Sequence, residues 1–394
     1  MSREPTASEH RRAAGSPRTL LRRGSAARGA GRARSRAVRH RRLVTTALVG
    51  VVAGLGLTAC GSSTSADDKP AGPAAELRLG YFPNLTHTTP IVGVAKGYFA
   101  RYLGSTKLSV QTFNAGPAEM EALVNGDLDA AYVGPSPAIN AYARSHGEAL
   151  RIVAGAASGG ASLVVRPGIA SAADLKGRHI ASPQLGNTQD VALRTWLKSQ
   201  GLTPSSATEP GDVNVEPTEN ATALQLFQDG KLDGAWVPEP WASRLVLDGG
   251  GKVLVDEKTL WPGGAFVTTH LVVRTEYLNQ HPETVKALIT GQLEANDWIA
   301  KDPAAARQVV NDELKRLTQK SLKPAVLDRA FGELTITNDP IAASLQTSAD
   351  HAVAVGLLKK VDLAGIYDLR QLNAALAARK QPAVSDAGLG SGGS

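Results

Sequence analysis

The sequence predicts an α/β protein with two similar lobes. Short apolar segments alternate with helical patterns, the alternation occurs twice, and the two occurrences are related by a constant spacing. The chain has 394 residues, enough for about two domains with cores of their own. We therefore expect an α/β fold with mixed, mainly parallel sheets and flanking helices.

An export segment precedes the first predicted strand. Residues 1–42 contain 13 Arg and two acidic residues, whereas the rest of the chain has 30 basic and 34 acidic residues. The net charge of +7 therefore comes from this leader and does not indicate nucleic-acid binding. The uncharged apolar run 43–59 is short for a membrane span and suits a secretory signal. The sequence leaves the start codon, and Sec or Tat export, open.

The apolar run ends in Leu57-Thr58-Ala59-Cys60, which resembles a bacterial lipobox. We expect residues 1–59 to be a signal peptide, Cys60 to be lipidated, and 60–75 to form a flexible tether. The protein would then be held at the extracytoplasmic face of the cell membrane by its lipid anchor. Cys60 is the only cysteine, so an intramolecular disulfide is excluded.

The first alternation predicts strands joined by helices, the order typical of a parallel sheet. Its strands are LRLGYF (77–82), LSVQTF (108–113), AAYVG (130–134) and RIVAGA (151–156). Its helices are TTPIVGVAKGYF (88–99), PAEMEALVNG (117–126) and SPAINAYAR (136–144). Pro90 in the first turn and Gly97 as a stop are typical helix boundaries.

The second alternation repeats the first. Its strands are HIASP (179–183), VNVEP (213–217) and DGAWVP (233–238), and its helices are 188–200, 221–230 and one from about Pro240. A shift of 104 residues superimposes equivalent positions, among them Gly126 on Gly230, Asp129 on Asp233 and Tyr132 on Trp236. This register predicts a structural repeat.

Two apolar segments, 161–166 and 266–274, flank the second alternation, and both end in Val-Val-Arg. We interpret them as the crossings between lobes. The expected organisation is lobe I (76–162), lobe II (163–265), a mostly helical return to lobe I (266–382) and a disordered tail (383–394).

Ligands of α/β sheets bind beyond the carboxyl ends of the strands. Each predicted lobe offers two loops of this kind, and all four are rich in small polar residues, Gly or Pro: 83–88, 134–137, 184–189 and 238–241. Helix N-termini converging there would favour an anion. The loops contain no Arg or Lys, which leaves His87 as the only possible cation and favours a small oxoanion over a polyphosphate.

Several loop residues have alternative roles. Ser136 and Thr188 are also ordinary helix caps. Glu239 pairs with His87, pairs with Arg244, or binds a cationic amine such as that of taurine. Trp241 follows a proline in a loop and is a candidate for ligand contact, whereas Trp236 and its equivalent Tyr132 can also pack in the core.

The sequence shows no Ser/His/Asp order, paired-carboxylate signature or P-loop. His87, His270 and Glu239 lack the spacing of a metal site. We therefore expect no enzyme, no catalytic residues, no metal and no cofactor, and a monomer that binds no nucleic acid.

Four segments resemble the periplasmic-type binding proteins for aliphatic sulfonates, nitrate and taurine. They are PNLTHTTPIVGVAKGYF, DAAYVGPSPAINAYAR, SPQLGNTQDVALRTWL and DGAWVPEPWASRLV, and the resemblance covers roughly residues 76–380. It implies the two-lobed type II periplasmic binding fold. It also implies a substrate-binding lipoprotein that delivers a small-molecule anion to the permease and ATPase subunits of an ABC transporter.

The resemblance also implies a set of ligand-binding residues. These are Asn84, His87, Thr88, Gly134, Ser136, Asn187, Thr188, Gln189, Glu239 and Trp241. The loop and aromatic patterns add Gln184 and Trp236. An aliphatic sulfonate is the first expectation for the cargo, with nitrate, taurine or a thiamine precursor as alternatives. An enzyme that resembles thiamine pyrimidine synthases is a remote alternative, because the export signal argues against it.

Overall fold

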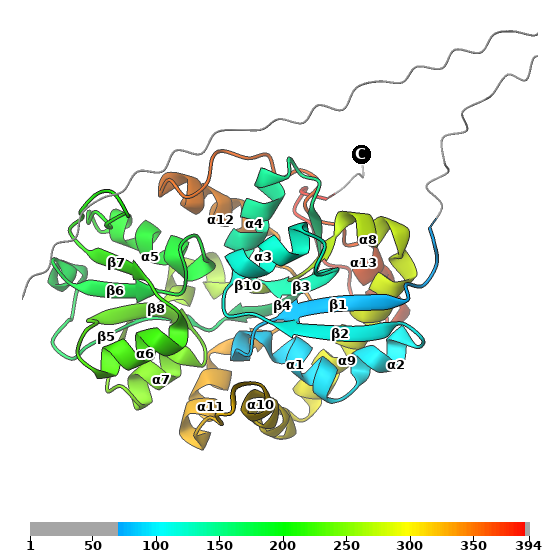
Figure 1. Cartoon of the computed structure of the whole chain (residues 1–394), viewed down its shortest axis with the longest axis horizontal. Helices are drawn as coiled ribbons and strands as arrows, with labels where there is room; N and C mark the ends of the chain where they lie inside the picture. The colour runs from blue at the N-terminus through cyan, green and yellow to red at the C-terminus, as the bar shows by residue number, and fades with distance from the viewer. Residues whose placement is uncertain (1–69, 391–394) are drawn as a thin grey trace, which may run out of the picture. The chain divides into compact units, whose positions relative to one another are not determined.

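The order of strands and helices follows the predicted alternation. The computed structural model describes residues 70–390 (Figure 1). The strands are β1 (Glu76–Tyr81), β2 (Lys107–Thr112), β3 (Ala130–Val133), β4 (Leu150–Gly159), β5 (Ala161–Val165), β6 (His179–Ser182), β7 (Asn214–Pro217), β8 (Gly234–Pro238), β9 (Lys252–Asp256), β10 (Val267–Arg274) and β11 (Leu334–Ile336).

Thirteen α-helices and four short 3-10 helices connect and cover these strands within the described residues. The α-helices are α1 (Thr88–Ala95), α2 (Tyr98–Leu103), α3 (Gly116–Val124), α4 (Pro135–Arg144), α5 (Thr188–Ser199), α6 (Asn220–Gln228), α7 (Trp241–Leu247), α8 (Thr275–Gln280), α9 (Pro282–Lys301), α10 (Pro303–Thr318), α11 (Pro324–Gly332), α12 (Ala343–Ala354) and α13 (Arg370–Ala378). The 3-10 helices are η1 (Leu85–His87), η2 (Ala172–Leu175), η3 (Glu257–Leu260) and η4 (Pro262–Gly264).

The first sheet has the order β11-β4-β10-β3-β1-β2. β1 pairs in parallel with β2 and with β3, whereas β10 lies antiparallel between β3 and β4. Figure 1 shows α3 and α4 on one side of this sheet and α1, α2 and α9 on the other. We call this sheet and its helices the first half.

The second sheet repeats this arrangement, with the order β7-β6-β8-β5-β9. β6 pairs in parallel with β7 and β8, and β5 lies antiparallel between β8 and β9. The strands β7, β6, β8, β5 and β9 thus take the places of β2, β1, β3, β10 and β4. This sheet and helices α5 to α7 form the second half, and the repeat predicted from the 104-residue register is present in its topology.

The helices α3 and α6 occupy equivalent positions in the two halves, and the same kind of turn follows each of them. α3 and α6 are offset by 104 residues at both ends. Gly126 and Gly230 follow them with φ of +80° and +82°, a left-handed conformation that favours glycine after a helix. The carboxylates of Asp129 and Asp233 then accept hydrogen bonds from the backbone N–H groups of Arg78 in β1 and His179 at the start of β6, both at 2.9 Å. The Gly-x-Leu-Asp pattern therefore joins each helix to its sheet.

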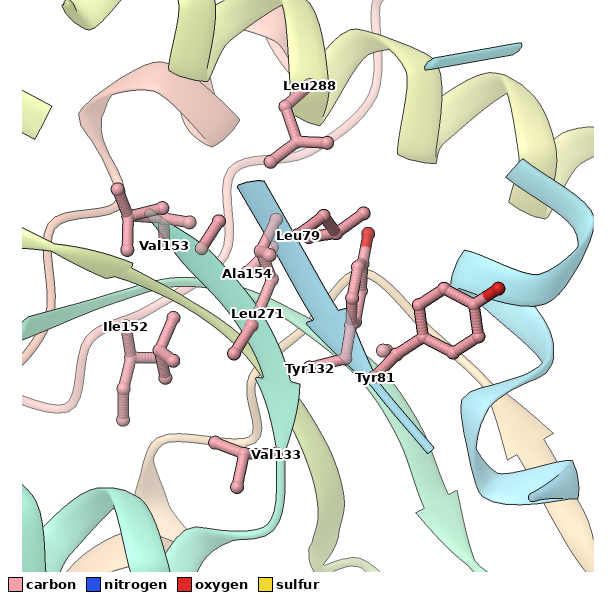
Figure 2. Close-up of a cluster of buried hydrophobic side chains, with 14 of the residues drawn as sticks. Leu79, Tyr81, Tyr132, Val133, Ile152, Val153, Ala154, Leu271 and Leu288 are labelled. Atoms are coloured by element: carbon pink, nitrogen blue, oxygen red, sulfur yellow. The ribbon is translucent and has the colours of Figure 1, made fainter. Parts of the chain in front are cut away.

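The core of the first half lies on both faces of its sheet. Leu79, Tyr132, Leu271 and Leu288 are fully buried. Figure 2 shows the first three on neighbouring strands, with Leu288 of α9 facing them. In the second half, one cluster packs under α5 and another under α6 and α7. Burial of these side chains, at about 25 cal/mol per Å² of apolar surface, is the main stabilisation of each half.

The chain crosses between the halves at places that differ from the expected ones. The expected crossings, 161–166 and 266–274, are β5 and β10, which lie inside the second and the first sheet. The chain passes from β4 to β5 at Gly160, and returns from β9 to β10 through 257–266. An apolar Val-Val run is better stabilised inside a sheet than in an exposed connection, which explains the difference.

Both ends of the described chain are more ordered than expected. Within the predicted tether, the N–H of Ala71 donates to the carbonyl of Gln280, and the N–H of Ala74 donates to Oγ1 of Thr284. Within the predicted tail, Gly365 donates to the carbonyl of Leu389. Hydrogen bonds to the protein body thus order segments that lack an apolar pattern. The signal peptide and Cys60 lie outside the described residues.

Among residues 70–390, no helix is both long enough and apolar enough to span a membrane.

Candidate functional site

A small polar cavity of about 20 Å³ lies where the strand ends of the two halves meet. Such a volume accommodates one or two groups the size of a water molecule. The polar cavity is lined by Phe82, Asn84, Thr86, His87, Asn114, Gly134, Asn187, Thr188, Gln189, Asn220, Pro238 and Thr268.

Each of the four predicted loops contributes to the polar cavity. Asn84 and His87 follow β1, Gly134 follows β3, Asn187 begins α5 after β6, and Pro238 ends β8. The rule that ligands meet the carboxyl ends of parallel strands therefore located this region from the sequence.

Thr188 and Gly134 bring the halves into contact at the cavity. A methyl group on Gly134 would lie 2.4 Å from Oγ1 of Thr188. This hydroxyl is buried without a hydrogen-bond partner among the described residues. Thr188 and Gln189 also occupy the first turn of α5, where backbone N–H groups have no partner inside the helix. The start of α5 thus offers several neutral donors to an anion.

A buried ion pair holds the loop before α5. Asp190 accepts hydrogen bonds from the Ser182 hydroxyl at 2.7 Å, from the Gly186 N–H at 2.9 Å and from Nε of Arg194 at 2.9 Å. Arg194 also donates to the carbonyl of Ser205 at 2.6 Å. Because both charges are buried and paired, they fix the loop without adding a free charge to the polar cavity.

His87 is a neutral donor and not the cation that the loop composition left possible. Its ring stacks on Phe82, with 4.4 Å between the ring centroids. The Phe82 N–H donates to Nδ1 at 3.2 Å, so Nδ1 accepts and Nε2 carries the hydrogen. Burial lowers the pKa of His87 to about 3. Because no Arg or Lys lines the polar cavity within residues 70–390, its donors are all neutral.

Glu239 pairs with neither His87 nor Arg244, two of the three partners considered from the sequence. Its carboxylate accepts hydrogen bonds from the Ser243 N–H at 3.1 Å and from the Ser243 hydroxyl at 3.0 Å. Burial raises its pKa to about 7, against the opposing effect of these two bonds. Glu239 therefore caps the start of α7 and does not face the polar cavity.

A larger cavity of about 430 Å³ adjoins the polar cavity, and we call it the groove. It is lined by Pro83, Asn84, Thr112, Phe113, Asn114, Glu219, Asn220, Ala221, Leu224, Gln225, Gln228, Pro240, Trp241, Arg244, Leu314, Leu317, Thr318, Lys320, Ser321 and Leu322. Asn84, Asn114 and Asn220 line both cavities and form the junction between them. The Oδ1 atom of Asn220 is buried without a hydrogen-bond partner among the described residues.

Trp241 joins the two halves at this junction. Its Nε1 donates to Oδ1 of Asn84 at 2.9 Å. The indole lines the groove, and its contact with the organic tail of a ligand stays a prediction. Because this bond uses the Asn84 oxygen, the Asn84 amide presents its nitrogen as the remaining polar group.

Five predicted site residues line neither cavity. Trp236 packs in the core and donates to Glu257 at 2.8 Å, and its equivalent Tyr132 is also buried. The Thr88 hydroxyl donates to the Leu85 carbonyl at 2.7 Å. Gln184 has a buried Oε1 atom without a partner among the described residues. Ser136 and Glu239 complete the five.

Six residues of the polar cavity were not among the predicted ligand-binding residues, although Thr86 and Pro238 lie in the predicted loops 83–88 and 238–241. Two of them, Asn114 and Asn220, follow the strands β2 and β7, so the same strand-end rule applied to every parallel strand finds them. Thr268 lies inside β10, where no sequence signal indicates a site. The others are Phe82, Thr86 and Pro238.

Among residues 70–390, no group of three or more His, Cys, Asp or Glu side chains comes together. The polar cavity presents neutral hydrogen-bond donors from His87, Thr188 and the start of α5.

Known proteins share this sequence and this fold. The model of the NMT1-like family matches residues 70–312. The taurine-binding periplasmic protein of Escherichia coli (strain K12) is 30% identical over 229 residues, which cover 58% of this chain and 68% of that protein.

Two solved structures give the fold. The alkanesulfonate-binding protein of Xanthomonas axonopodis pv. citri, bound to MOPS, has a TM-score of 0.61 at 24% identity and covers 73% of this chain and 95% of its own. The periplasmic nitrate-binding protein of Synechocystis PCC 6803 has a TM-score of 0.64 at 18% identity and covers 78% of this chain and 90% of its own. The chain therefore belongs to the NMT1-like family and has the fold of the type II periplasmic binding proteins.

Proposed function

We propose that this protein is the extracytoplasmic solute-binding component of an ABC importer and that it binds an organic anion, an aliphatic sulfonate, between its two halves. The family match and the taurine-binding relative support a binding protein over an enzyme. In this proposal the permease and ATPase subunits are its partners, and it acts as a monomer. Lipidation of Cys60, which holds the protein at the membrane, is part of the same proposal.

The choice of an aliphatic sulfonate as the cargo rests on the junction between the two cavities. The polar cavity has room for one or two oxygens of an anion, whereas the groove is about twenty times larger. An anion of few atoms, such as nitrate or bicarbonate, would leave most of the groove to water. A sulfonate inserts one or two of its oxygens into the polar cavity and lays its carbon chain along the groove, where Phe113, Leu224 and Trp241 supply apolar surface.

The donors also suit a sulfonate. The head group carries a single negative charge spread over three oxygens, each of which accepts hydrogen bonds. Thr188, the start of α5 and the Nε2 hydrogen of His87 are neutral donors from different directions. In a water-poor cavity such bonds are worth more than in solution, so Lys or Arg is not required.

A zwitterionic sulfonate such as taurine is the second candidate, and one observation favours it. Oδ1 of Asn220, buried without a partner among the described residues, lies at the junction. Glu219 precedes it and lines the groove. An acceptor and a carboxylate at this place are complementary to an ammonium group close to the head group.

Isothermal titration of the purified protein tests the proposal. The ligands are butanesulfonate, taurine, nitrate and hydroxymethylpyrimidine. We expect a Kd in the micromolar range for butanesulfonate, and taurine tighter than butanesulfonate if the junction binds an ammonium group. Heat from nitrate or hydroxymethylpyrimidine, with silence from both sulfonates, would refute sulfonate binding.

A further inference from the structure

The wall of the groove beyond Trp241 carries positive charge, unlike the polar cavity. Arg244 of α7 and Lys320, which follows α10, both line the groove. Pro238 lines the polar cavity, Trp241 lies at the junction, and Arg244 comes one helical turn later, about 4.5 Å farther along α7. Arg244 therefore stands on the part of the groove that leads away from the head group. The ion pair of Lys323 with Asp248 brings the segment that contains Lys320 to the same end of α7.

Arg244 is already oriented for a ligand. Its guanidinium lies over the Trp241 ring, 4.9 Å from the ring centroid. Nε faces Asp248 at 3.4 Å, and the two terminal nitrogens make no hydrogen bond within residues 70–390. Stacking on an aromatic ring fixes the plane of the guanidinium while leaving its paired donors free, the arrangement that binds a carboxylate through two parallel bonds.

The neighbouring acidic residues do not cancel this charge. Asp248 is shared, because Lys323 also binds it at 2.8 Å. Glu219 immediately precedes Asn220, at the junction end of α6. Gln228, at the other end of the groove wall formed by α6, is eight residues away, or about 12 Å. A second acidic group, beyond the sulfonate, would therefore be repelled by Glu219 at the junction and attracted to Arg244 and Lys320 farther along the groove.

We propose that the preferred ligand is an anion with two acidic ends, a sulfonate whose carbon chain carries a carboxylate at its far end. This inference rests on the proposed function, because it assigns the sulfonate to the polar cavity. Arg244 binds the distal carboxylate with its two terminal nitrogens, and Lys320 adds a second positive charge from the other half.

The test compares ligands of equal chain length. Isothermal titration measures Kd for butanesulfonate and for 4-sulfobutanoate, which differs by its terminal carboxylate. We expect 4-sulfobutanoate to bind the wild-type protein at least tenfold more tightly. Arg244→Gln should reduce this ratio to less than threefold, and Lys320→Gln should reduce it by about threefold.

Arg307→Gln is the matched control. Arg307 faces Asp328 at 3.4 Å, the distance between Arg244 and Asp248, but it does not line the groove. Its variant should keep the wild-type ratio.

The outcomes distinguish a failure of the distal-carboxylate proposal from a failure of the proposed sulfonate binding. Equal binding of both sulfonates by the wild-type protein overturns the distal carboxylate, as does an Arg244→Gln variant that weakens both ligands equally. If neither sulfonate binds, the proposed function fails and this inference fails with it. If Arg244→Gln does not fold, an unchanged ratio in Lys320→Gln, on an exposed loop residue, overturns the proposal.

Discussion

The two halves of the molecule share one strand order and differ in the chemistry of equivalent positions. Tyr132 and Trp236 occupy the same place, and both are buried aromatic residues with a polar group that needs a partner. The Tyr132 hydroxyl donates to the amide of Gln292 at 2.8 Å, whereas Nε1 of Trp236 donates to the carboxylate of Glu257 at 2.8 Å. The repeat therefore keeps the position of the buried aromatic residue. Its hydrogen-bond partner is a neutral amide in the first half and a carboxyl group in the second half.

The same contrast holds at the polar cavity. Gly134 and Pro238 are separated by 104 residues, and so are Asn84 and Thr188, and all four line the cavity. The first half contributes a neutral histidine and two asparagines, Asn84 and Asn114, whereas the second half contributes the start of α5 and Asn220. A binding site built at the junction of two repeats thus has equivalent positions with different functions.

The largest effect should come from adding a side chain at Gly134, where the equivalent position of the second half has Pro238. Gly134→Ala places a methyl group 2.4 Å from Oγ1 of Thr188, so the halves cannot meet as they do here. Because the backbone of Gly134 has φ of −73°, which alanine adopts without strain, the fold should persist. We expect ligand affinity to fall more than 100-fold, about 3 kcal/mol, in isothermal titration.

Gly332→Ala is the control, because a methyl group at Gly332 has no atom within 4 Å. It should leave affinity unchanged and raise thermal stability slightly, because alanine is a better helix former than glycine at the end of α11. Unchanged affinity in Gly134→Ala would show that the contact with Thr188 is absent from the ligand-bound state.

The second prediction concerns Glu257→Gln, which gives Trp236 an amide partner like the one that Tyr132 has in the first half. Burial raises the pKa of Glu257 to about 7, although hydrogen bonds from Trp236 and Trp261 oppose this shift. Between the ordinary value of 4.5 and about 7, the folded protein binds more protons than the unfolded chain. The free energy of unfolding contributed by Glu257 is therefore fully present below pH 4.5 and lost as pH rises to 7, by about 3 kcal/mol.

Glu257→Gln retains an oxygen for Nε1 of Trp236, as Gln292 does for Tyr132. The difference in unfolding free energy between pH 5 and pH 8, measured by urea denaturation, should shift by up to about 3 kcal/mol relative to wild type. His87 and His270, whose pKa values burial lowers to about 3 and about 4, act in the opposite direction in both proteins and cancel in this comparison. An identical pH dependence in the two proteins would contradict the assignment.

The smallest effect concerns Glu119 and its equivalent, Ala223. Glu119 is completely buried, neither carboxylate oxygen has a partner among the described residues, and burial raises its pKa well above the ordinary value. Glu119→Met keeps the volume and removes the polar group, so the free energy of unfolding at pH 8 should rise by about 1 kcal/mol. Urea denaturation measures this change, and a loss of more than about 2 kcal/mol would mean that the carboxyl group has a partner such as bound water.

Local patterns predicted much of the fold and part of the site. The strands and helices of both alternations lie close to their predicted places because apolar periodicity and helix-ending glycines act within a few residues. The strand-end rule located Asn84, His87, Gly134 and Asn187 in one cavity. The same rule, applied to two strands per half, missed Asn114 and Asn220.

Other features depend on contacts between distant segments. No sequence pattern indicates that Glu239 binds Ser243, that Trp241 binds Asn84, or that residues 71–75 pack against α8 and α9. The strands β5 and β10 also lie inside different sheets, where each pairs with strands that include ones far away in the sequence.

The sequence by itself therefore determined the α/β class, the two repeats and the strand ends that meet at the polar cavity, because these follow from the spacing of apolar and turn residues. The tertiary structure decided which charges are available. It buries His87 and makes it neutral, and it pairs Asp190 with Arg194. It leaves the terminal nitrogens of Arg244, a residue that lines the groove, without a hydrogen bond within residues 70–390. Burial and pairing set the electrostatics of a site, and both arise only when segments far apart in the chain come together.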